Sequence, residues 1–505
     1  MFRKELSRVS PEALGIDSGK LREMLSRLED CGTEMHGFVL ARRGKIASEC
    51  WWSPYSKDLV HICHSFGKSF MATAIGVACS ENLLSVDDKV SDLFYDEITE
   101  YGIPLTDNMK KLTVEHILTM SNGMSEIADS GEDFIRNYLS CSVDKEPGIE
   151  FLYNTAGSCM LGAIIQKITG MTVLEYLTPR VFEKIGLETD KLGWIMFKNG
   201  VHAAPGVSTN TENNLRLGML YLNNGSWGEE QLINSEWINK ATAKRVENDF
   251  GSGSFDMRSG YGYQLWMCKS PGVYRFDGGH GQIAVMSPRE NIAVSINQAA
   301  SMPSGSDAVL DILDEYLFQK ELPDNLPENP VSLESLRAYE VSRRLPLPEK
   351  RSVPNSYSEW NGIYRVTEGR FHIHPELRPV GDKNVYEDFY DTSDFFAKTV
   401  SVYFKSPNSC ELVIDRIFTF NVSMDGEVIP VHTGSAIPEY YMTYSSGYFE
   451  QNQSLIIQTR YFQTCFRNTL VLKKEKNGLR IEVKKEKLHD NDPFYYYNAF
   501  AERIV

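Results

Sequence analysis

Three kinds of signal are missing from this chain of 505 residues. It contains no run of about 18 apolar residues, the length that a membrane helix needs, and no apolar core of a signal peptide near its N-terminus. Lysine and arginine number 52 against 68 aspartate and glutamate residues, and a net charge of -16 argues against a basic surface for nucleic acid. We therefore expect a cytoplasmic protein with no membrane span and no nucleic-acid partner.

Paired cysteine spacings are also missing. The nine cysteines are scattered and odd in number, and none forms a Cys-x-x-Cys motif, so neither a disulfide framework nor a zinc site is indicated. His372 and His374 could face one side of a strand, but no carboxylate or thiol stands at ligand spacing from them. The sequence predicts reduced thiols, no metal site and no cofactor.

What is present is an ordinary globular composition, with 42% hydrophobic and 24% charged residues. Residues 35–49 alternate around an Arg-Gly-Lys turn, which predicts a hairpin of two strands. Helical periodicity begins at Ser65, and helical segments continue to about residue 225. Strand patterns return after Gly260, so we expect an α/β (α+β) domain with one antiparallel sheet, flanking helices and an inserted helical subdomain.

A proline-rich stretch ends this first region. Residues 321–354 carry six prolines among charged residues, which predicts a linker with one short helix. Strand patterns dominate beyond it, and Asn477-Gly478 marks a hairpin tip. The predicted organisation is therefore an α/β domain in residues 1–320, the linker in residues 321–354, and an all-β barrel or sandwich in residues 355–505.

The segment HSFGKSF places Ser65 and Lys68 three residues apart where a predicted helix begins. Residues i and i+3 share one face of a helix, so the lysine amine can reach the serine hydroxyl, and the N–H groups of the helix N-terminus can stabilise negative charge. A lysine that accepts the serine proton activates a weak nucleophile. Alone, the pattern also fits a capping serine followed by a solvated lysine. His61 and His64 flank the pair, and we interpret them as packing residues because no acid for a triad can be nominated.

Three segments resemble the serine β-lactamase and penicillin-binding-protein superfamily, in its class C-like branch of esterases, D-amino-acid amidases and aminohexanoate-dimer hydrolases. They are HGFVLARRGKIASE, HSFGKSFMATAIGVACSENLLSVDDKVSDLF and LTVEHILTMSNGM, and they occur in the order typical of that family. The resemblance covers about the first two-thirds of the chain. It implies the β-lactamase/transpeptidase-like fold, with Ser65 as the nucleophile.

The resemblance also implies a tyrosine that moves the proton. EPGIEFLYNTAGS supplies Tyr153 at the family's Tyr-x-Asn motif, where the tyrosine acts as general base and acid together with Lys68. Thr155 stands where β-lactamases carry asparagine. The resemblance implies that this position contacts the substrate, and the change to threonine argues against recognition of a β-lactam amide. Considered alone, Tyr153 also fits a core tyrosine.

The third element of the family contacts the substrate and supplies an oxyanion donor. FDGGHGQ resembles its Gly-rich segment, so that Gly279, His280 and Gly281 replace the usual Lys-Thr-Gly. This register assigns the backbone N–H of Gln282 to the oxyanion hole, beside the N–H of Ser65.

A more literal match to Lys-Thr-Gly occurs in residues 432–434, but it lies in the predicted C-terminal β domain, outside the sheet that should hold the motif. In the preferred register, Gly279-His280-Gly281 lacks the lysine of Lys-Thr-Gly, and with it the positive charge that usually holds a substrate carboxylate. We therefore expect a neutral or differently charged substrate, and whether His280 touches it is left open.

The residues and the resemblance together predict a serine hydrolase that cleaves an ester or amide bond of a small molecule or short peptide through an acyl-enzyme on Ser65. The alternatives are a D,D-peptidase or D-aminopeptidase, a β-lactamase, and a catalytically inactive scaffold. The intact Ser65, Lys68 and Tyr153 argue against the scaffold. The natural substrate, the role of the C-terminal domain and the oligomeric state are not determined by the sequence.

Overall fold

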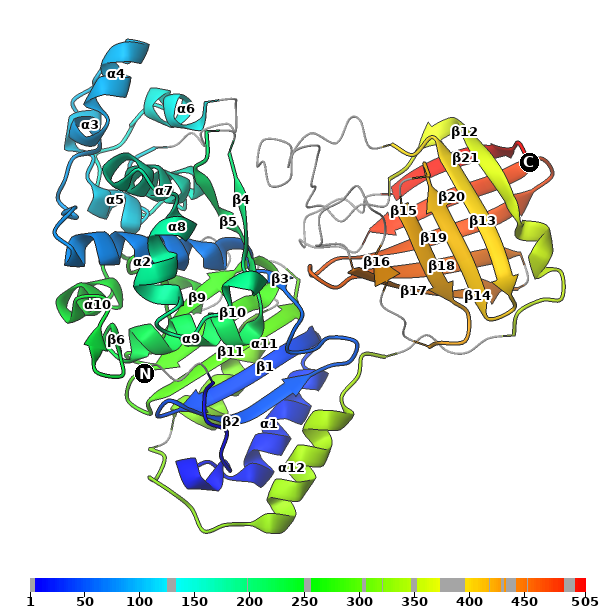
Figure 1. The fold of residues 1–505 in the computed structure, drawn as a ribbon, viewed down its shortest axis with the longest axis horizontal. Coiled ribbons are helices and arrows are strands. Elements are labelled where there is room, and N and C mark those ends of the chain that lie inside the picture. Colours follow the sequence, from blue (N-terminus) through cyan, green and yellow to red (C-terminus); the bar gives the residue numbers. More distant parts are fainter. Residues whose placement is uncertain are drawn as a thin grey trace. The chain divides into compact units, whose positions relative to one another are not determined.

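The chain forms two compact units, which are described separately (Figure 1). The first comprises Met1–Trp52 and Ser56–Arg343, and the second comprises Ser53–Tyr55 and Arg344–Val505. The computed structural model describes residues 5–124, 133–197, 199–248, 256–301, 306–319, 321–346, 352–372, 396–416, 418–427, 431–432, 442–451, 453–485 and 496–505. His374 and residues 433–434, which the sequence singled out, lie outside the described residues.

A six-stranded antiparallel sheet lies at the centre of the first unit (Figure 1). Its order is β2-β1-β11-β10-β9-β8, with β1 (Glu34–Arg42), β2 (Lys45–Trp51), β8 (Trp266–Met267), β9 (Tyr274–Gly278), β10 (Gln282–Ser287) and β11 (Ile292–Ala299). The N-terminal hairpin therefore joins the late strands through the β1–β11 pair. This confirms the prediction of one sheet built from both ends of the domain.

Helices and short strands fill the chain between these two sets of strands. The helices are α2 (Gly67–Ser80), α3 (Val90–Leu93), α4 (Tyr95–Tyr101), α5 (Val114–Leu118), α6 (Phe134–Ser140), α7 (Thr155–Thr169), α8 (Val173–Leu177), α9 (Thr211–Leu222) and α10 (Ser235–Ala241). A three-stranded sheet of order β3-β5-β4 contains β3 (His61–Ile62), β4 (Gly193–Met196) and β5 (His202–Thr209), and β6 (Ser226–Trp227) pairs with β7 (Glu230–Gln231).

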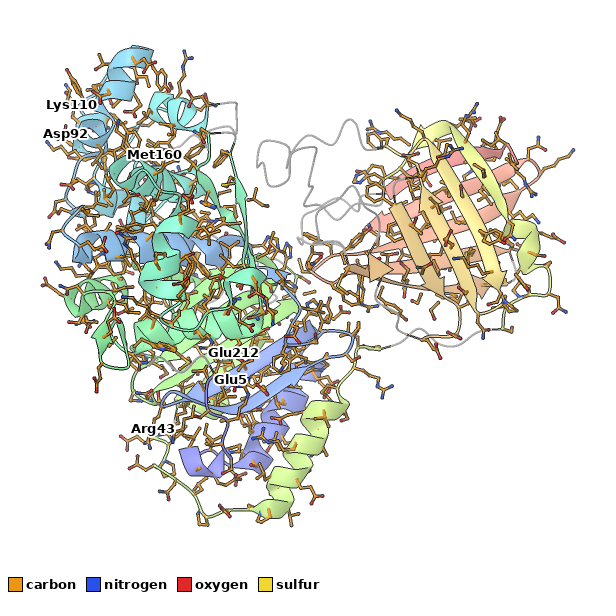
Figure 2. All side chains as sticks on the ribbon, viewed as in Figure 1. Glu5, Arg43, Asp92, Lys110, Met160 and Glu212 are labelled. Carbon is orange, nitrogen blue, oxygen red and sulfur yellow. The ribbon has the colours of Figure 1, made fainter. Side chains whose placement is uncertain are left out.

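The two longest helices of this region, α2 and α7, pack against each other in its interior. Met160 of α7 is fully buried, whereas Asp92 and Lys110 are exposed (Figure 2). Nearly every residue of α2 is buried, which is typical of a helix that is apolar all round. No single helix among the described residues is long and apolar enough to cross a membrane; α7 and the segment Val173–Phe182 reach that length only together, across a bend of 68°.

The predicted linker contributes a helix to the first unit. In α12 (Pro330–Ser342), the side chain of Asn329 accepts a hydrogen bond from the Ser332 N–H, and Pro330 lies in the first turn, where no N–H is needed. This helix packs on α1 (Ser18–Asp30), which also contacts α11 (Asp307–Leu313). The sequence indicated a linker because composition alone does not distinguish a proline in the first turn of a helix from a proline in an extended segment.

The second unit is a β-barrel. Its sheet has the order β15-β14-β13-β12-β21-β20-β19-β18-β17-β16, and β15 also pairs in parallel with β17. This contact closes nine of the described strands into a ring, with β16 beside β17. The strands are β12 (Gly362–Arg370), β13 (Thr399–Ser406), β14 (Ser409–Ile414), β15 (Phe418–Ser423), β16 (Val431–His432), β17 (Met442–Glu450), β18 (Ser454–Tyr461), β19 (Arg467–Glu475), β20 (Gly478–Lys485) and β21 (Tyr496–Arg503). The prediction of a barrel or sandwich is confirmed as a barrel.

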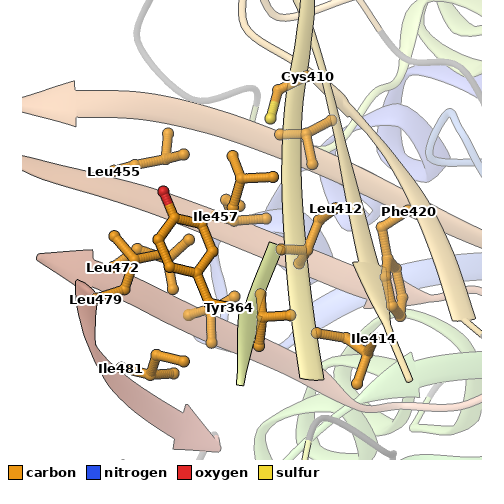
Figure 3. Packing of buried hydrophobic residues seen from close by; sticks show 14 of the residues in the cluster. Tyr364, Cys410, Leu412, Ile414, Phe420, Leu455, Ile457, Leu472, Leu479 and Ile481 are labelled. Carbon is orange, nitrogen blue, oxygen red and sulfur yellow. The ribbon is translucent and has the colours of Figure 1, made fainter. Parts of the chain in front are cut away.

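Alternating residues of these strands fill the barrel (Figure 3). Leu412 and Ile414 of β14 face inward together with Leu472 of β19 and Ile481 of β20, and all four are at most 3% exposed. Lys473, next to Leu472 in β19, points the other way, and its amine lies 2.6 Å from the carboxylate of Glu482 in β20. The barrel interior is therefore a packed apolar core.

Candidate active site

Ser65 lies in a short 3-10 turn, η2 (His64–Phe66), which leads into α2. The turn follows β3, and the Cys63 N–H donates to the Val207 carbonyl of β5 at 2.8 Å. At the junction, a Cβ on Gly67 would lie 2.0 Å from the Ala204 carbonyl oxygen, so glycine is required there. The small sheet thus holds the turn that carries Ser65.

Lys68 is the hydrogen-bond partner of Ser65. Its Nζ lies 2.8 Å from the Ser65 Oγ, and its side chain is only 1% exposed. Among the described residues, Lys68 forms no ion pair with a carboxylate. The predicted sharing of one helix face by residues i and i+3 brings the two groups together, although Ser65 itself precedes the α-helix.

Tyr153 completes the group. The Lys68 Nζ lies 4.9 Å from the centroid of the Tyr153 ring. The Trp266 ring stacks on the same tyrosine, with a centroid distance of 5.8 Å and an interplanar angle of 26°. The structure therefore brings together the three residues that the sequence nominated for proton transfer and nucleophilic attack.

Met120, which the sequence analysis did not single out, accepts hydrogen bonds from the backbone on both sides of Tyr153. The Leu152 N–H donates to the Met120 carbonyl at 2.7 Å, and the Asn154 N–H donates to the Met120 Sδ at 3.2 Å. Asn154 also caps α7, because its side chain accepts from the Gly157 N–H at 2.8 Å. Thr155, the predicted substrate contact, is the first residue of that helix and is half-buried.

Residues Gly279–Gly281 form a 3-10 turn, η7, between β9 and β10. His280 is buried at its centre, where its Nδ1 donates to the Ala300 carbonyl at 3.2 Å and its own carbonyl accepts from the Ala300 N–H at 3.0 Å. Its ring meets that of His64 edge to face at 5.3 Å. One nitrogen of His280 is thus used to attach the turn to the end of β11.

Gly278, at the end of β9, packs directly against the Ser65 turn. A Cβ on this residue would lie 1.9 Å from the Cys63 carbonyl oxygen and 3.1 Å from the Phe66 nitrogen. The sequence register assigned the oxyanion donor to Gln282, but Gln282 lies in β10, one strand further into the sheet. Its side chain is fully buried and bonds to Asn297 and to the Gln298 carbonyl.

The sequence analysis missed the strand β9, which precedes the η7 turn. Tyr274 and Phe276 alternate with Arg275 and Asp277 in this strand, which is the signal that could have revealed it. With β9 in place, Gly278 and Gly279 are the residues that face the Ser65 turn.

Strand β9 also carries a buried cation, Arg275. Arg275 is fully buried, and its Nε donates to Asp277 at 2.6 Å, while the neighbouring guanidinium nitrogen donates to the Met267 carbonyl at 3.1 Å. Burial opposes the charge, but the attraction of Asp277 prevails and the pKa of Arg275 is raised. Its charge is therefore compensated within the protein.

Histidine side chains gather beside the nucleophile turn. Burial lowers the pKa of His64 well below its usual value, and the nearby His280, His61 and Lys68 add to this effect, so His64 is neutral at neutral pH. The Nε2 of His61 lies 3.1 Å from the Nδ1 of His36, and its Nδ1 donates to the Ile62 carbonyl at 2.9 Å. His61 and His64 thus lie against other parts of the first unit, in keeping with a packing role.

The sheet with its helical insertion, and a serine–lysine pair at the start of the buried helix, define the class of this protein. Residues 25–314 match the Beta-lactamase family. Since this match spans more than half of the chain, the chain belongs to the beta-lactamase family of hydrolases.

Three known proteins show how distant the similarity is. The 6-aminohexanoate-dimer hydrolase of Paenarthrobacter ureafaciens is 20% identical over 298 residues, which are 54% of this chain and 74% of the relative. A penicillin-binding protein homologue from Caulobacter crescentus has 14% identity and a TM-score of 0.50 over 60% of this chain and 97% of its own. An octameric penicillin-binding protein homologue from Pyrococcus abyssi has 15% identity and a TM-score of 0.47 over 95% of this chain and 99% of its own. At such identities a structural likeness shows the fold alone.

Proposed function

We propose that this protein is a serine hydrolase that cleaves an ester or amide bond of a small molecule or short peptide through an acyl-enzyme on Ser65. The observation that carries the proposal is the 2.8 Å contact between the Ser65 Oγ and the Nζ of a lysine that is 1% exposed. A buried amine next to a half-buried hydroxyl is the arrangement that nucleophile activation requires.

In the proposed acylation, the Ser65 Oγ attacks the substrate carbonyl carbon, and the neutral amine of Lys68 accepts the hydroxyl proton. A bond from Oγ to carbon forms, and the bond from carbon to the leaving oxygen or nitrogen breaks. Tyr153, whose ring lies against Lys68, relays the proton to the leaving group. Water then attacks the ester, its proton returns through the same two residues to the Ser65 Oγ, and the acid is released.

Two backbone N–H groups support the oxyanion in this proposal. One belongs to Ser65, and the other belongs to the Gly278–Gly279 segment, in place of Gln282. The support for this change is the packing of Gly278 against the Cys63 carbonyl and the Phe66 nitrogen. In comparable enzymes, one such donor contributes about 3 kcal/mol to the stability of the transition state.

The charges near the site favour a substrate without a carboxylate anchor. The position of the family's lysine is taken by a turn whose histidine bonds to the Ala300 carbonyl, and His64 beside it is neutral at neutral pH. Arg275 is fully buried and paired with Asp277. We therefore expect turnover of neutral esters and amides to exceed that of β-lactams, because the described residues around the site offer no free cation for the carboxylate of a β-lactam.

The test is intact-mass measurement after exposure to a fluorophosphonate probe, for the wild type, Ser65→Ala and Ser80→Ala. Ser80 lies in the same helix, where its hydroxyl donates to the Gly76 carbonyl, so its variant is a matched control. We expect a single adduct on the wild type and on Ser80→Ala, and none on Ser65→Ala. A folded wild type that takes up no adduct would contradict the mechanism and favour the scaffold alternative.

A second measurement ranks the substrates once Ser65 is labelled. Values of kcat/KM are compared for a short-chain ester, a D-amino-acid amide and a penicillin. Faster turnover of the penicillin than of both others would contradict the substrate class proposed above.

A further inference from the structure

Gln264 bonds to three separate segments of the first unit through every polar group it has. It lies two residues before β8, with a left-handed φ of 57°, and it is 2% exposed. Its backbone and side chain together take part in five hydrogen bonds with residues that are distant in sequence. A buried amide with all of its partners in place is a rigid connection.

Two of these bonds join the helices on which the proposed chemistry depends. The hydroxyl of Ser69, which follows Lys68 in α2, donates to the Gln264 carbonyl at 2.8 Å. The hydroxyl of Ser158, in the first turns of α7, donates to the Gln264 Oε1 at 2.6 Å. Gln264 therefore bonds both to the helix of Lys68 and to the helix that follows Tyr153.

The other three bonds reach the end of α5. The Gln264 Nε2 donates to the carbonyls of Ile117 and Leu118 at 2.9 and 3.1 Å, and its backbone N–H donates to the Leu118 carbonyl at 2.9 Å. Two residues further on, Met120 accepts hydrogen bonds from both neighbours of Tyr153. The amide of Gln264 thus supports the backbone that presents this tyrosine.

The same segment also contacts the tyrosine ring. Trp266, two residues after Gln264, stacks on Tyr153, and the ring of Tyr261 meets Trp266 edge to face at 5.0 Å. Gln264 is therefore hydrogen-bonded to the helices and backbone around the site, whereas Trp266 packs on the Tyr153 ring.

We propose that Gln264 is a positioning residue that sets the distance between the Lys68 amine and the Tyr153 hydroxyl. The inference rests on the proposed function, because that distance matters only if the two groups pass a proton. Without the amide, the Ser158 hydroxyl turns to its alternative acceptor, the Asn154 carbonyl next to Tyr153, at 3.4 Å. Displacements of about 1 Å between reacting groups lower rates by roughly 100-fold.

Three variants test the proposal. Gln264→Met removes the side-chain bonds with little change of volume. Gln264→Glu keeps an acceptor for Ser158 and, while protonated, one donor for a carbonyl. Asn213→Leu is the matched control, since Asn213 is 1% exposed and its amide also makes three hydrogen bonds, with Glu188 and Thr209 rather than with α2 or α7. Thermal melting shows that each variant is compared in its folded state.

The readouts are the second-order rate constant of labelling by the fluorophosphonate probe and its dependence on pH. We expect Gln264→Met to lower the rate constant by about 10- to 100-fold and to shift the pH profile, and Asn213→Leu to stay within about two-fold of the wild type at an equal or larger loss of stability. Gln264→Glu should retain more activity than Gln264→Met below the pKa of the new carboxyl, which burial raises, and lose it above.

Other results overturn the proposal. Labelling of Gln264→Met at the wild-type rate with an unchanged pH profile would show that the distance does not depend on the amide. An equal loss of labelling rate in Gln264→Met and Asn213→Leu would show that the effect comes from reduced stability rather than from positioning. Should Gln264→Met not fold, the comparison of Gln264→Glu with Asn213→Leu decides the question. Absence of labelling in the wild type contradicts the proposed function instead, so the two failures are distinguishable.

Discussion

The residues around Ser65 and the interior of the C-terminal barrel are both largely buried but are built from different side chains. Around Ser65, the buried groups include an amine (Lys68), a guanidinium (Arg275), a primary amide (Gln264) and an imidazole (His280). The core cluster of the barrel contains Val400, Leu412, Leu472 and similar apolar residues. Burying a polar group costs free energy unless it is hydrogen-bonded, so such groups accumulate where their geometry is used.

The largest effect that this comparison predicts is that of Lys68→Met. Loss of the base should lower the rate of labelling at Ser65 by about 10³-fold or more. Because the variant replaces a buried amine by an apolar side chain of similar length, the free energy of unfolding should stay equal or rise by about 1 kcal/mol. Labelling kinetics and urea denaturation measure the two quantities. If the melting temperature collapses along with activity, Lys68 is part of the fold's stability and the contrast with the barrel is weaker.

The converse change is Leu472→Ala in the barrel. Its side chain is fully buried among apolar neighbours, so the cavity and the lost apolar contact should lower the free energy of unfolding by about 2–5 kcal/mol. Labelling of Ser65 in the folded protein should stay within about two-fold of the wild type. Denaturation followed by circular dichroism gives the stability, and a change below about 1 kcal/mol would contradict a tightly packed core.

His202 is a buried polar residue of the first unit that has no part in the proposed mechanism. Burial lowers its pKa to about 4, whereas the unfolded chain has a histidine pKa of about 6.5. The unfolded state therefore binds more protons between these values, so stability is fully present above pH 6.5 and declines by roughly 3 kcal/mol as the pH falls to 4. His202→Gln should remove this part of the pH dependence. Urea denaturation of both proteins between pH 4 and pH 7.5 measures the difference, and equal slopes would contradict the prediction.

The smallest effect should come from the barrel surface. Lys473 and Glu482 lie 2.6 Å apart, but both side chains are partly exposed, and exposed ion pairs contribute about 0.2–1 kcal/mol. Lys473→Ala should change the free energy of unfolding by less than about 1 kcal/mol, and 0.5 M salt should reduce the difference. It is also the natural control for Leu472→Ala, since the residues are adjacent.

Local patterns predicted the elements with strong periodicity. The β1–β2 hairpin, α7 and the β19–β20 hairpin follow directly from apolar spacing and turn residues. The contact between Ser65 and Lys68 was predicted because it depends on helix geometry within three residues. Tyr153 could be placed there only by resemblance, since it is 85 residues away from Lys68 (153 − 68) and local spacing says nothing about such contacts.

The features that the sequence did not reveal are those that depend on tertiary contacts. Gln264 is one glutamine among many until the fold places Ser69, Ser158 and Leu118 around it. The assignment of α12 to the first unit depends on its packing against α1, not on its composition. Strand β9 was missed because it is short and carries two charged residues in five.

The parallel contact that closes the barrel follows from arithmetic. Strand direction reverses at every antiparallel contact. After one circuit of a closed ring it must be back at its starting value, so the number of antiparallel contacts must be even. A ring of nine described strands therefore cannot be antiparallel throughout, and one seam with parallel neighbours is unavoidable. That seam, between β15 and β17, spans only two register positions, whereas β19 and β20 pair at eight. Parallel pairing is also slightly less stable per residue, which makes this seam the place where the ring should first open in hydrogen exchange.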